Sequence, residues 1–266
     1  MKISIICVAA IAVCGATKAE TVDLAGVDAT ATLLASDTVY VNSSETTASL
    51  VFDSADAVTF AGTIQGNIAV VKQGAGELTL TGANTYSGGT CVSNGWLKVN
   101  KDSQVGGGAV RLGGGNLRLG GAWTPSTSCI TLDVDATIDV GGADNYLWIK
   151  PSTFVTAGHT MTKIGAGYLY VGDTGFTGAI VNGATWVIDE GWMAVASKSD
   201  PFGGAYGTNL ADLTLELHEG TYLTAEAHLP FPARVVLRGA ELRGLRHEFG
   251  GPETTENGDP SASTGP

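Results

Sequence analysis

Hydrophobic and polar residues alternate with a period of two over many short stretches of this chain. In residues 77–81, Leu78 and Leu80 fall on one face, whereas Glu77, Thr79 and Thr81 fall on the other. Such alternation is typical of a β-strand with one buried face. After the N-terminal region, no stretch of ten residues shows a helical period with caps, and paired glycines recur. The pattern therefore predicts an all-β fold of short strands.

The strand centres themselves recur at a longer interval. Leu78, Leu97, Leu117 and Ile138 are separated by 19, 20 and 21 residues. Strands that repeat every ~20 residues describe the rungs of a coil, each stacked on the last. We therefore expect a parallel β-helix (β-solenoid) of about 11 rungs, roughly 50 Å long. A second, interleaved series contains Val92, Val110, Ile130, Leu147, Leu169 and Val187, followed by Met193, Leu213 and Val235.

An internal repeat supports the coil over an antiparallel sandwich or barrel, which short strands at regular spacing also fit. The pattern K-x-G-x-G-x-L begins at Lys72 and returns at Lys163. The pattern G-W-(L/M)-x-V follows at Gly95 and again at Gly191, and both copies end in a glycine pair. A sandwich has no reason to keep these elements in a fixed order, so we infer a duplication, with copies near residues 70–107 and 161–204.

The chain divides into four expected segments. Residues 1–19 have the basic start, apolar stretch and small-residue end of a cleaved signal peptide. Residues 20–50 are polar and weakly alternating, and we expect them to cap the first rung. Residues 51–245 form the solenoid. Residues 246–266 are rich in Ser, Thr, Gly, Pro and acidic residues, which predicts a disordered tail.

The negative net charge of the chain argues against two classes of partner. Cleavage after residue 19 removes Lys2 and Lys18 but no acid, leaving 12 basic against 26 acidic residues. A chain this acidic repels nucleic acid and anionic membrane surfaces. The apolar N-terminal stretch is too short to span a bilayer as a helix, so we expect no direct membrane span.

Two cysteines, Cys91 and Cys129, remain after cleavage of the signal peptide. An exported protein meets an oxidising compartment, so a disulfide has to be weighed. With rungs of ~20 residues the two cysteines stand two rungs apart on one face, at ~9.6 Å. That separation exceeds the ~7 Å limit for a disulfide. We expect both thiols to stay free of each other.

No residue set is assigned a catalytic, cofactor-binding or metal-binding role. The glycine runs lack the following helix that phosphate binding requires. The four histidines are far apart and lack metal-ligand spacing, although His159 is placed to face a neighbouring turn. One acidic group contains Asp133, Asp135, Asp139 and Asp144. We expect solvated carboxylates on the outer face, with Ca²⁺ binding or carbohydrate-active catalysis as alternatives. We expect no Arg or Lys close by to serve as the base of a lyase.

Aromatic residues offer the other candidate surface. If Leu169 and Val171 face the core, Tyr168 and Tyr170 face outward. We expect them to lie beside a ladder that contains Trp96 and Trp192. Outward aromatics either stack on one another along the rungs or stack on sugar rings.

Residues 72–99 closely resemble the autotransporter-associated β-strand repeat, also called the passenger-associated transport repeat. The most specific part is the heptapeptide Asn84-Thr85-Tyr86-Ser87-Gly88-Gly89-Thr90, which the second copy lacks. The resemblance implies a parallel β-helical passenger of secreted or surface-exposed bacterial proteins, in which the repeat supports export or folding. It does not extend to the membrane barrel of conventional autotransporters, because no aromatic-girdled strand series follows residue 250.

The interpretation that follows is a secreted or cell-surface structural or adhesive solenoid without catalytic activity or cofactors. Its partners would be extracellular glycans or surface proteins. Two alternatives remain, a glycan-binding module that uses the outward aromatics and a carbohydrate-active β-helix enzyme.

Overall fold

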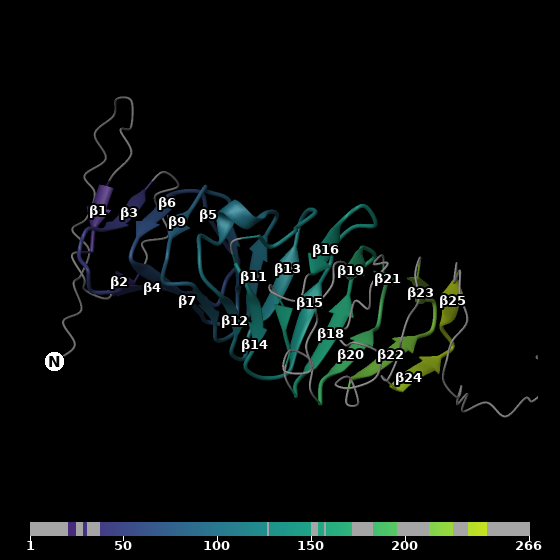
Figure 1. The fold of residues 1–266 in the computed structure, drawn as a ribbon. Coiled ribbons are helices and arrows are strands. Elements are labelled where there is room, and N and C mark those ends of the chain that lie inside the picture. Colours follow the sequence, from purple (N-terminus) through teal and green to yellow (C-terminus); the bar gives the residue numbers. More distant parts are fainter. Residues whose placement is uncertain are drawn as a thin grey trace, which may run out of the picture.

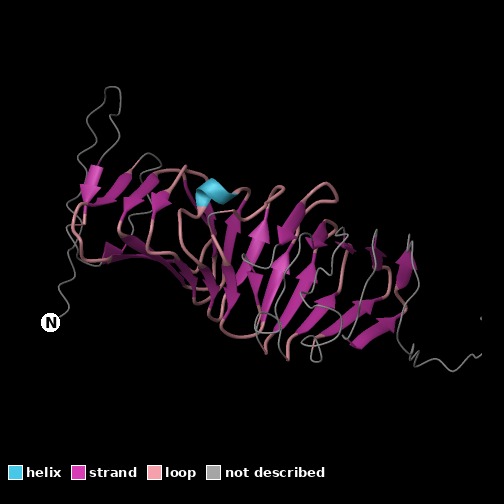
Figure 2. Ribbon diagram, viewed as in Figure 1, coloured by secondary structure: helices cyan, strands magenta, loops and turns pink. Residues whose placement is uncertain are grey.

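The computed structural model of this protein is an elongated stack of short strands (Figure 1). It describes residues 21–24, 29–30, 38–126, 128–149, 154–156, 158–171, 183–195, 213–225 and 234–243. Among these residues there are 25 strands and no α-helix, and the one helical element is the 3₁₀ turn η1 (Asp102–Gln104), drawn in cyan in Figure 2. The predicted all-β parallel solenoid is confirmed.

Four sheets, in which every strand pair is parallel, make up the coil. Sheet A contains β1 (Thr21–Asp23), β3 (Val39–Asn42), β6 (Thr63–Gly66) and β9 (Thr85–Tyr86). Sheet B contains β2 (Ala29–Thr30), β4 (Ala48–Asp53), β7 (Ile68–Gln73), β10 (Thr90–Val92), β12 (Val110–Leu112), β14 (Ile130–Leu132) and β17 (Phe154–Val155). Sheet C contains β5 (Val58–Phe60), β8 (Glu77–Leu80), β11 (Trp96–Val99), β13 (Asn116–Leu119), β15 (Ala136–Asp139), β18 (Thr160–Ile164), β20 (Thr185–Ile188), β22 (Thr214–His218) and β24 (Arg234–Arg238). Sheet D contains β16 (Tyr146–Ile149), β19 (Tyr168–Val171), β21 (Trp192–Val195), β23 (Tyr222–Ala225) and β25 (Glu241–Arg243).

From β3 to β18, each turn of the coil visits three sides in the same order. In the early turns the chain runs from sheet A to sheet B to sheet C, as in β6, β7 and β8. Sheet D takes the place of sheet A in the later turns, where β18 in sheet C leads directly into β19. On the side that sheets A and D share, the stretch between the two sheets contains η1 and the isolated β-bridge between Trp123 and Leu147. The coil is thus three-sided up to β18, and beyond β18 the described strands belong to sheets C and D.

The core is a set of apolar columns that run along the rod. Leu78, Leu97, Leu117 and Ile138 are register partners in consecutive strands of sheet C, and all four are buried. The predicted column is therefore confirmed residue by residue. Stacking of branched side chains at one strand spacing removes their apolar surface from water in every rung, which favours this parallel arrangement over isolated turns.

The rungs do not keep a constant length. Ile138 pairs with Lys163, Lys163 with Ile188, and Ile188 with Leu217, so the register partners in these rungs lie further apart in the chain than Leu78, Leu97 and Leu117 do. Sheet C consequently has nine described strands, fewer than the eleven or so rungs expected from a constant rung length. The expectation was wrong here because the added residues lie between strands and leave the hydrophobic alternation within each strand unchanged.

The second predicted series was wrong in its register. Val110 and Ile130 do pair in sheet B, but their partner in β10 is Thr90. Val92 pairs with Leu112, two residues further along. A slip of two residues keeps every side chain on the same face, so alternation alone cannot detect it. The later members divide between two sheets: Val187 and Val235 belong to sheet C, and Leu147, Leu169 and Met193 belong to sheet D.

The two copies of the repeat occupy different corners. Lys72 lies near the end of β7 in sheet B, and the glycines that follow it lie in the turn before β8 of sheet C. Lys163 lies on β18 of sheet C and its glycines turn into β19 of sheet D. The second copy is therefore displaced by one side of the coil. Its expected end at residues 198–204 lies outside the described residues.

The described residues cover only part of the four expected segments. The strands β3 and β4 overlap the expected cap at residues 20–50 and pair with the sheets as ordinary rung strands. The expected signal peptide, residues 1–19, and the expected tail, residues 246–266, both lie outside the described residues. No helix long and apolar enough to cross a membrane was found in the described part of the chain.

Candidate functional site

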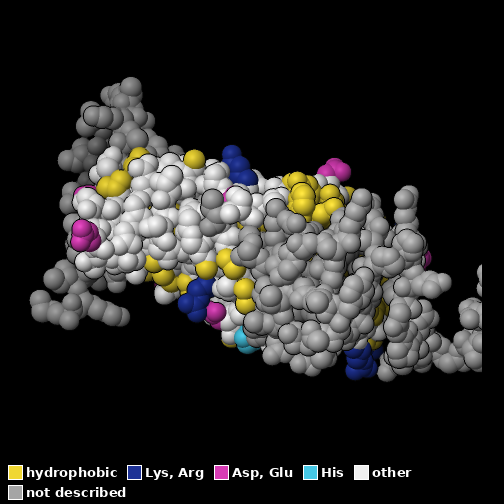
Figure 3. Space-filling model, in the orientation of Figure 1, with side chains coloured by type: hydrophobic (Ala, Val, Ile, Leu, Met, Phe, Trp, Pro, Cys, Tyr) yellow, Lys and Arg dark blue, Asp and Glu magenta, His cyan; other side chains and the backbone are white. Residues whose placement is uncertain are grey.

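A column of aromatic rings runs along the outer face of sheet D. We call Tyr146, Tyr168, Trp192 and Tyr222 the aromatic ladder, because they are register partners in four consecutive strands. Trp192 stacks on Tyr168 with ring centroids 4.2 Å apart and on Tyr222 at 5.4 Å. All four side chains are half-buried. In Figure 3, hydrophobic side chains gather above the position of β16, where the ladder begins.

A second, shorter aromatic column lies beside the ladder. Trp148 and Tyr170 are register partners, with ring centroids 4.9 Å apart in an edge-to-face arrangement. The next partners in this column are Ala194 and Thr224, so the aromatic surface becomes narrower toward β25. Arg243 closes the column, with its guanidinium 4.3 Å from the centre of the Tyr222 ring. A cation over an aromatic face is attracted by the ring quadrupole.

The orientation of these rings limits their chemistry. In the ladder, Trp192 covers one face of the Tyr168 ring and one face of the Tyr222 ring. The outward placement predicted for Tyr168 and Tyr170 is found. Trp96 was wrongly assigned to this ladder, because it lies on sheet C, where the Arg118 guanidinium sits 4.5 Å from the centre of its ring. Alternation distinguishes inside from outside but not one outer side from another.

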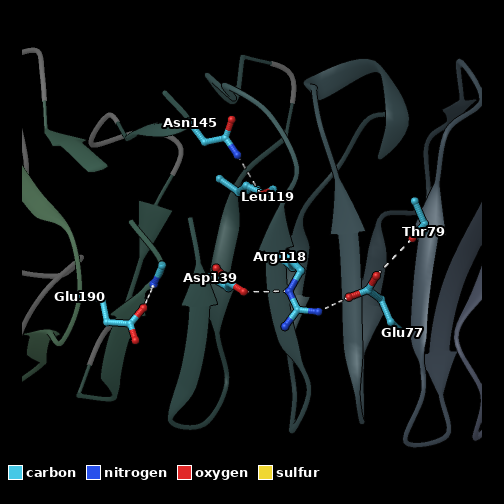
Figure 4. A network of polar contacts seen from close by, with 8 residues as sticks. Glu77, Thr79, Arg118, Leu119, Asp139, Asn145 and Glu190 are labelled. Carbon is cyan, nitrogen blue, oxygen red and sulfur yellow. Dashed lines mark hydrogen bonds and ion pairs between the residues drawn. The ribbon is translucent and has the colours of Figure 1, made fainter. Parts of the chain in front are cut away.

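Arg118 joins carboxylates from rungs on both sides of it on the outer face of sheet C (Figure 4). Its Nε donates to Asp139 Oδ2 at 2.8 Å, and its Nη1 pairs with Glu77. Glu77 lies two rungs before Arg118, and Asp139 one rung after it. The arginine charge is therefore offset by the two carboxylates, and the two ion pairs together span four rungs of sheet C. Ion pairs at such half-exposed positions contribute modestly, at about 1 kcal/mol or less each.

The acidic group singled out from the sequence is dispersed. Asp133 pairs with Arg111 at 2.9 Å, and Asp139 pairs with Arg118. Asp135 instead accepts a hydrogen bond from the Thr160 backbone, at 2.7 Å. The expected lack of nearby basic residues was thus wrong, because residues that are distant in the chain become neighbours on adjacent rungs. The fourth member, Asp144, is exposed in the turn before β16. Among described residues, no group of three acidic, histidine or cysteine side chains is arranged to hold a metal ion.

Sequence reasoning missed one polar cluster, which is centred on His218. Its Nδ1 lies 2.6 Å from Asp189 and its Nε2 lies 2.9 Å from Glu216, which also pairs with Arg238. Hydrogen bonds to Glu216 and then to Asp189 raise the pKa of His218. Both ring nitrogens are engaged by carboxylates, which suits a structural ion pair better than a proton shuttle. The spacing Glu-x-His in β22 was the only local signal for it.

The remaining described histidine and cysteine residues are His159, Cys91 and Cys129. His159 lies with Nδ1 3.9 Å from Asp135, on the neighbouring turn as expected, whereas His228 and His247 lie outside the described residues. Cys91 and Cys129 are free thiols on sheet B, in β10 and just before β14.

The heptapeptide that carries the family resemblance is an internal structural element. The Asn84 amide accepts a hydrogen bond from the Ile64 backbone at 2.9 Å and donates one to the Gln104 carbonyl at 2.6 Å. It thereby connects the rung before it to the rung after it. The Tyr86 ring is fully buried, and its hydroxyl lies 2.5 Å from the Thr90 hydroxyl. Burial raises the pKa of Tyr86. Asn84 and Tyr86 are thus buried and Asn84 connects neighbouring rungs, whereas Thr85, Ser87 and Gly88 are exposed.

Comparison with known proteins agrees with these features. The family described as Passenger-associated-transport-repeat matches residues 70–99, the segment from β7 to β11 that includes the first lysine corner and the heptapeptide. This chain carries a passenger-associated transport repeat. It is also 40% identical over 62 residues to an autotransporter adhesin, "Adhesin BmaC autotransporter", of Brucella suis biovar 1 (strain 1330). That match covers 23% of this chain but 2% of the adhesin. No solved structure matches the chain significantly. The matched repeat thus lies within a parallel β-helix.

Proposed function

We propose that this chain is a structural and adhesive segment of a secreted or surface passenger, and that it has no catalytic activity. Three features support the proposal: the matched repeat, the similarity to an autotransporter adhesin over 62 residues, and a continuous solenoid core. The absence of catalysis is favoured because the outer carboxylates Asp133 and Asp139 are each engaged by an arginine. A general acid needs a proton-binding group that is directed at a substrate rather than held by a permanent cation.

The observation that carries the adhesive part is the aromatic outer face of sheet D. It combines the aromatic ladder with Trp148 and Tyr170 on consecutive strands. Tyrosine and tryptophan are enriched at protein interfaces because they bring large contact areas at a low cost in side-chain entropy. The partners we propose are extracellular glycans or surface proteins. The stacked rings of the ladder favour a protein partner, because their faces are already covered and sugar stacking uses an open ring face.

The test is binding of the purified chain to host-type cells and to extracellular matrix proteins on a sensor surface. The variant Tyr168→Ala/Tyr170→Ala removes two outward rings from sheet D. The matched control Trp96→Ala removes an outward ring from sheet C. We expect the double variant to lose binding and the control to bind as the wild type does. Equal binding by all three proteins would overturn the proposal for sheet D.

A glycan-binding module is the second candidate. It is favoured because the register partner of Tyr170 on the next strand is Ala194, whose side chain is smaller than an aromatic ring. A glycan array probed with the wild type and the double variant distinguishes it from protein adhesion. Sugar-dependent signal that the double variant loses would identify a glycan module, and no signal across the array would leave a protein partner. Release of reducing ends or unsaturated products from pectin or alginate would instead show a carbohydrate-active enzyme and contradict the non-catalytic proposal.

Export through a cleaved signal peptide is also proposed. The N-terminal sequence of the exported chain tests it directly. We expect the mature protein to begin at Glu20. A chain that retains its N-terminal methionine in the cytoplasm of a host bacterium would contradict this.

A further inference from the structure

The lysine of the first repeat copy is buried in the rod. Lys72 is 2% exposed and lies at the corner between sheets B and C. Its Nζ donates to the carbonyl oxygens of Gln73 at 2.5 Å and Gly74 at 2.8 Å, both in its own turn. It also donates to the Asn94 carbonyl at 3.1 Å, in the turn one rung further along the chain. An ammonium group with three carbonyl acceptors has its hydrogen-bonding capacity filled without a carboxylate.

The lysine of the second copy makes the same arrangement at another corner. Lys163 is fully buried between sheets C and D. Its Nζ donates to the Gly165 carbonyl at 2.5 Å in its own turn and to the Glu190 carbonyl at 2.7 Å in the following turn. The sequences around the two lysines have only the repeat in common, and the sheets that flank them differ. The contact pattern therefore belongs to the motif and does not depend on its position around the coil.

A glycine in the following turn allows this close stacking in both copies. Gly95 and Gly191 have φ angles of 66° and 70°. A Cβ at Gly95 would lie 2.4 Å from the Gly76 carbonyl oxygen, and one at Gly191 would lie 2.3 Å from the Gly167 carbonyl oxygen. Only a residue without a side chain lets the second turn lie directly on the first. In both copies this glycine directly follows the residue whose carbonyl accepts the inter-rung hydrogen bond from the lysine.

We propose that the repeat lysine is an inter-rung clamp, which makes its own rung and the next rung fold and open as one unit. The carbonyl of the next turn supplies one of the acceptors for the buried ammonium group. Until that turn is in place, the lysine lacks this acceptor, and a buried polar group without its partner is costly. Each clamped rung therefore depends on its C-terminal neighbour, and the motif has the same effect at either corner. This inference is independent of the adhesive proposal.

Native-state hydrogen–deuterium exchange of the full chain tests the clamp. In Lys72→Met the chain keeps a side chain of similar length but loses the donors. We expect exchange to become about tenfold faster in residues 68–80 and 90–99 together. Residues 160–171 should stay as in the wild type. The matched control Lys98→Met removes an outer lysine from β11 and should leave both regions unchanged.

The second corner provides the reciprocal test. Lys163→Met should accelerate exchange in residues 160–171 and 189–193 together, and leave residues 68–80 unchanged. Faster exchange in the lysine's own turn alone would overturn the inter-rung clamp, as would effects no larger than those of Lys98→Met. If either variant fails to fold, wild-type exchange in low urea decides the question. Residues 68–80 and 90–99 should then share one opening curve, and separate curves would overturn the proposal.

Discussion

The two copies of the repeat occur in regions of the rod that differ in rung length. In the first region Ile64, Asn84 and Gln104 are spaced by 20 residues, and the Asn84 amide bonds to the backbone of the other two. In the second region the rungs are longer and unequal, and the heptapeptide is absent. The lysine corner is present in both. A corner contact joins two adjacent turns, whereas the Asn84 bridge joins three consecutive rungs.

The two regions also differ in their outer faces. Around the first copy, sheet C carries the Glu77–Arg118–Asp139 network. Around the second copy, sheet D carries the aromatic ladder. Both arrangements join side chains of different rungs, because register partners stand about 4.8 Å apart along a parallel sheet. The difference indicates that rung cohesion is provided by the core and the corners, while the outer faces can vary.

The largest effect is expected from placing side chains where the corner turns stack. Gly95→Ala and Gly191→Ala should each lower the free energy of unfolding by about 3 kcal/mol, since each combines a positive φ with a backbone clash. Urea unfolding followed by circular dichroism measures this loss. Gly142→Ala is the control, because a Cβ there meets nothing within 4 Å. A loss at Gly95 but none at Gly191 would show that the two corners are not equivalent.

The next largest effect concerns the bridge that occurs only in the first region. Asn84→Ala removes both hydrogen bonds and leaves the buried partners on Ile64 and Gln104 unpaired, at a cost of about 2 kcal/mol. Exposed Asn100 serves as the control, and Asn100→Ala should change stability by less than about 0.5 kcal/mol. Equal unfolding curves for the two variants would contradict the bridging role of Asn84.

A smaller effect is expected from the outer faces. Trp192→Ala removes ring stacking on two sides and should cost about 1–2 kcal/mol. Trp96→Ala loses a cation–π contact with Arg118 and should cost about 1 kcal/mol or less. Thermal unfolding of both variants under one buffer condition compares them. A larger loss of stability for Trp96→Ala would indicate that the charged network on sheet C stabilises the rod more than the aromatic ladder on sheet D does.

A further effect is a pH dependence of the second corner. Burial lowers the pKa of Lys163 to about 8 from its ordinary 10.5, although Glu190 and Asp139 partly offset this. Between these two pH values the unfolded chain holds more protons than the folded chain, so the contribution of Lys163 to stability rises with pH. The unfolding free energy of the wild type minus that of Lys163→Met should therefore rise from pH 8 to pH 9.5. A constant difference would show that the folded lysine keeps its ordinary pKa.

Much of the fold follows from two periods in the sequence. The two-residue alternation identifies the buried face of each strand, and the regular spacing of Leu78, Leu97 and Leu117 gives their stacking. Alternation does not tell which of three sides a strand joins, which is why Trp96 was placed with Trp192. It also does not reveal neighbours on other rungs. Arg111 and Asp133 are far apart in the chain but lie 2.9 Å apart in space.

The polar cluster of His218 was hidden for a related reason. Asp189 lies on the preceding rung, which is longer than the early rungs of the rod. A constant rung length would have aligned His218 with a different residue. Irregular rung length thus prevents the neighbours of a residue in the second region from being predicted from the sequence. The repeat identifies its two lysines, but it does not show which carbonyls accept their hydrogen bonds.

The central claim is that one rung advances the rod by one strand spacing, however many residues that rung contains. Spin-label distances on the outer face of sheet C test it, in a background with Cys91 and Cys129 replaced by serine. One label replaces Thr79, and the other replaces Ile164, four rungs on, or Arg238, seven rungs on. The account predicts backbone separations of about 19 Å and about 34 Å. Two distances that do not increase with rung number would contradict it.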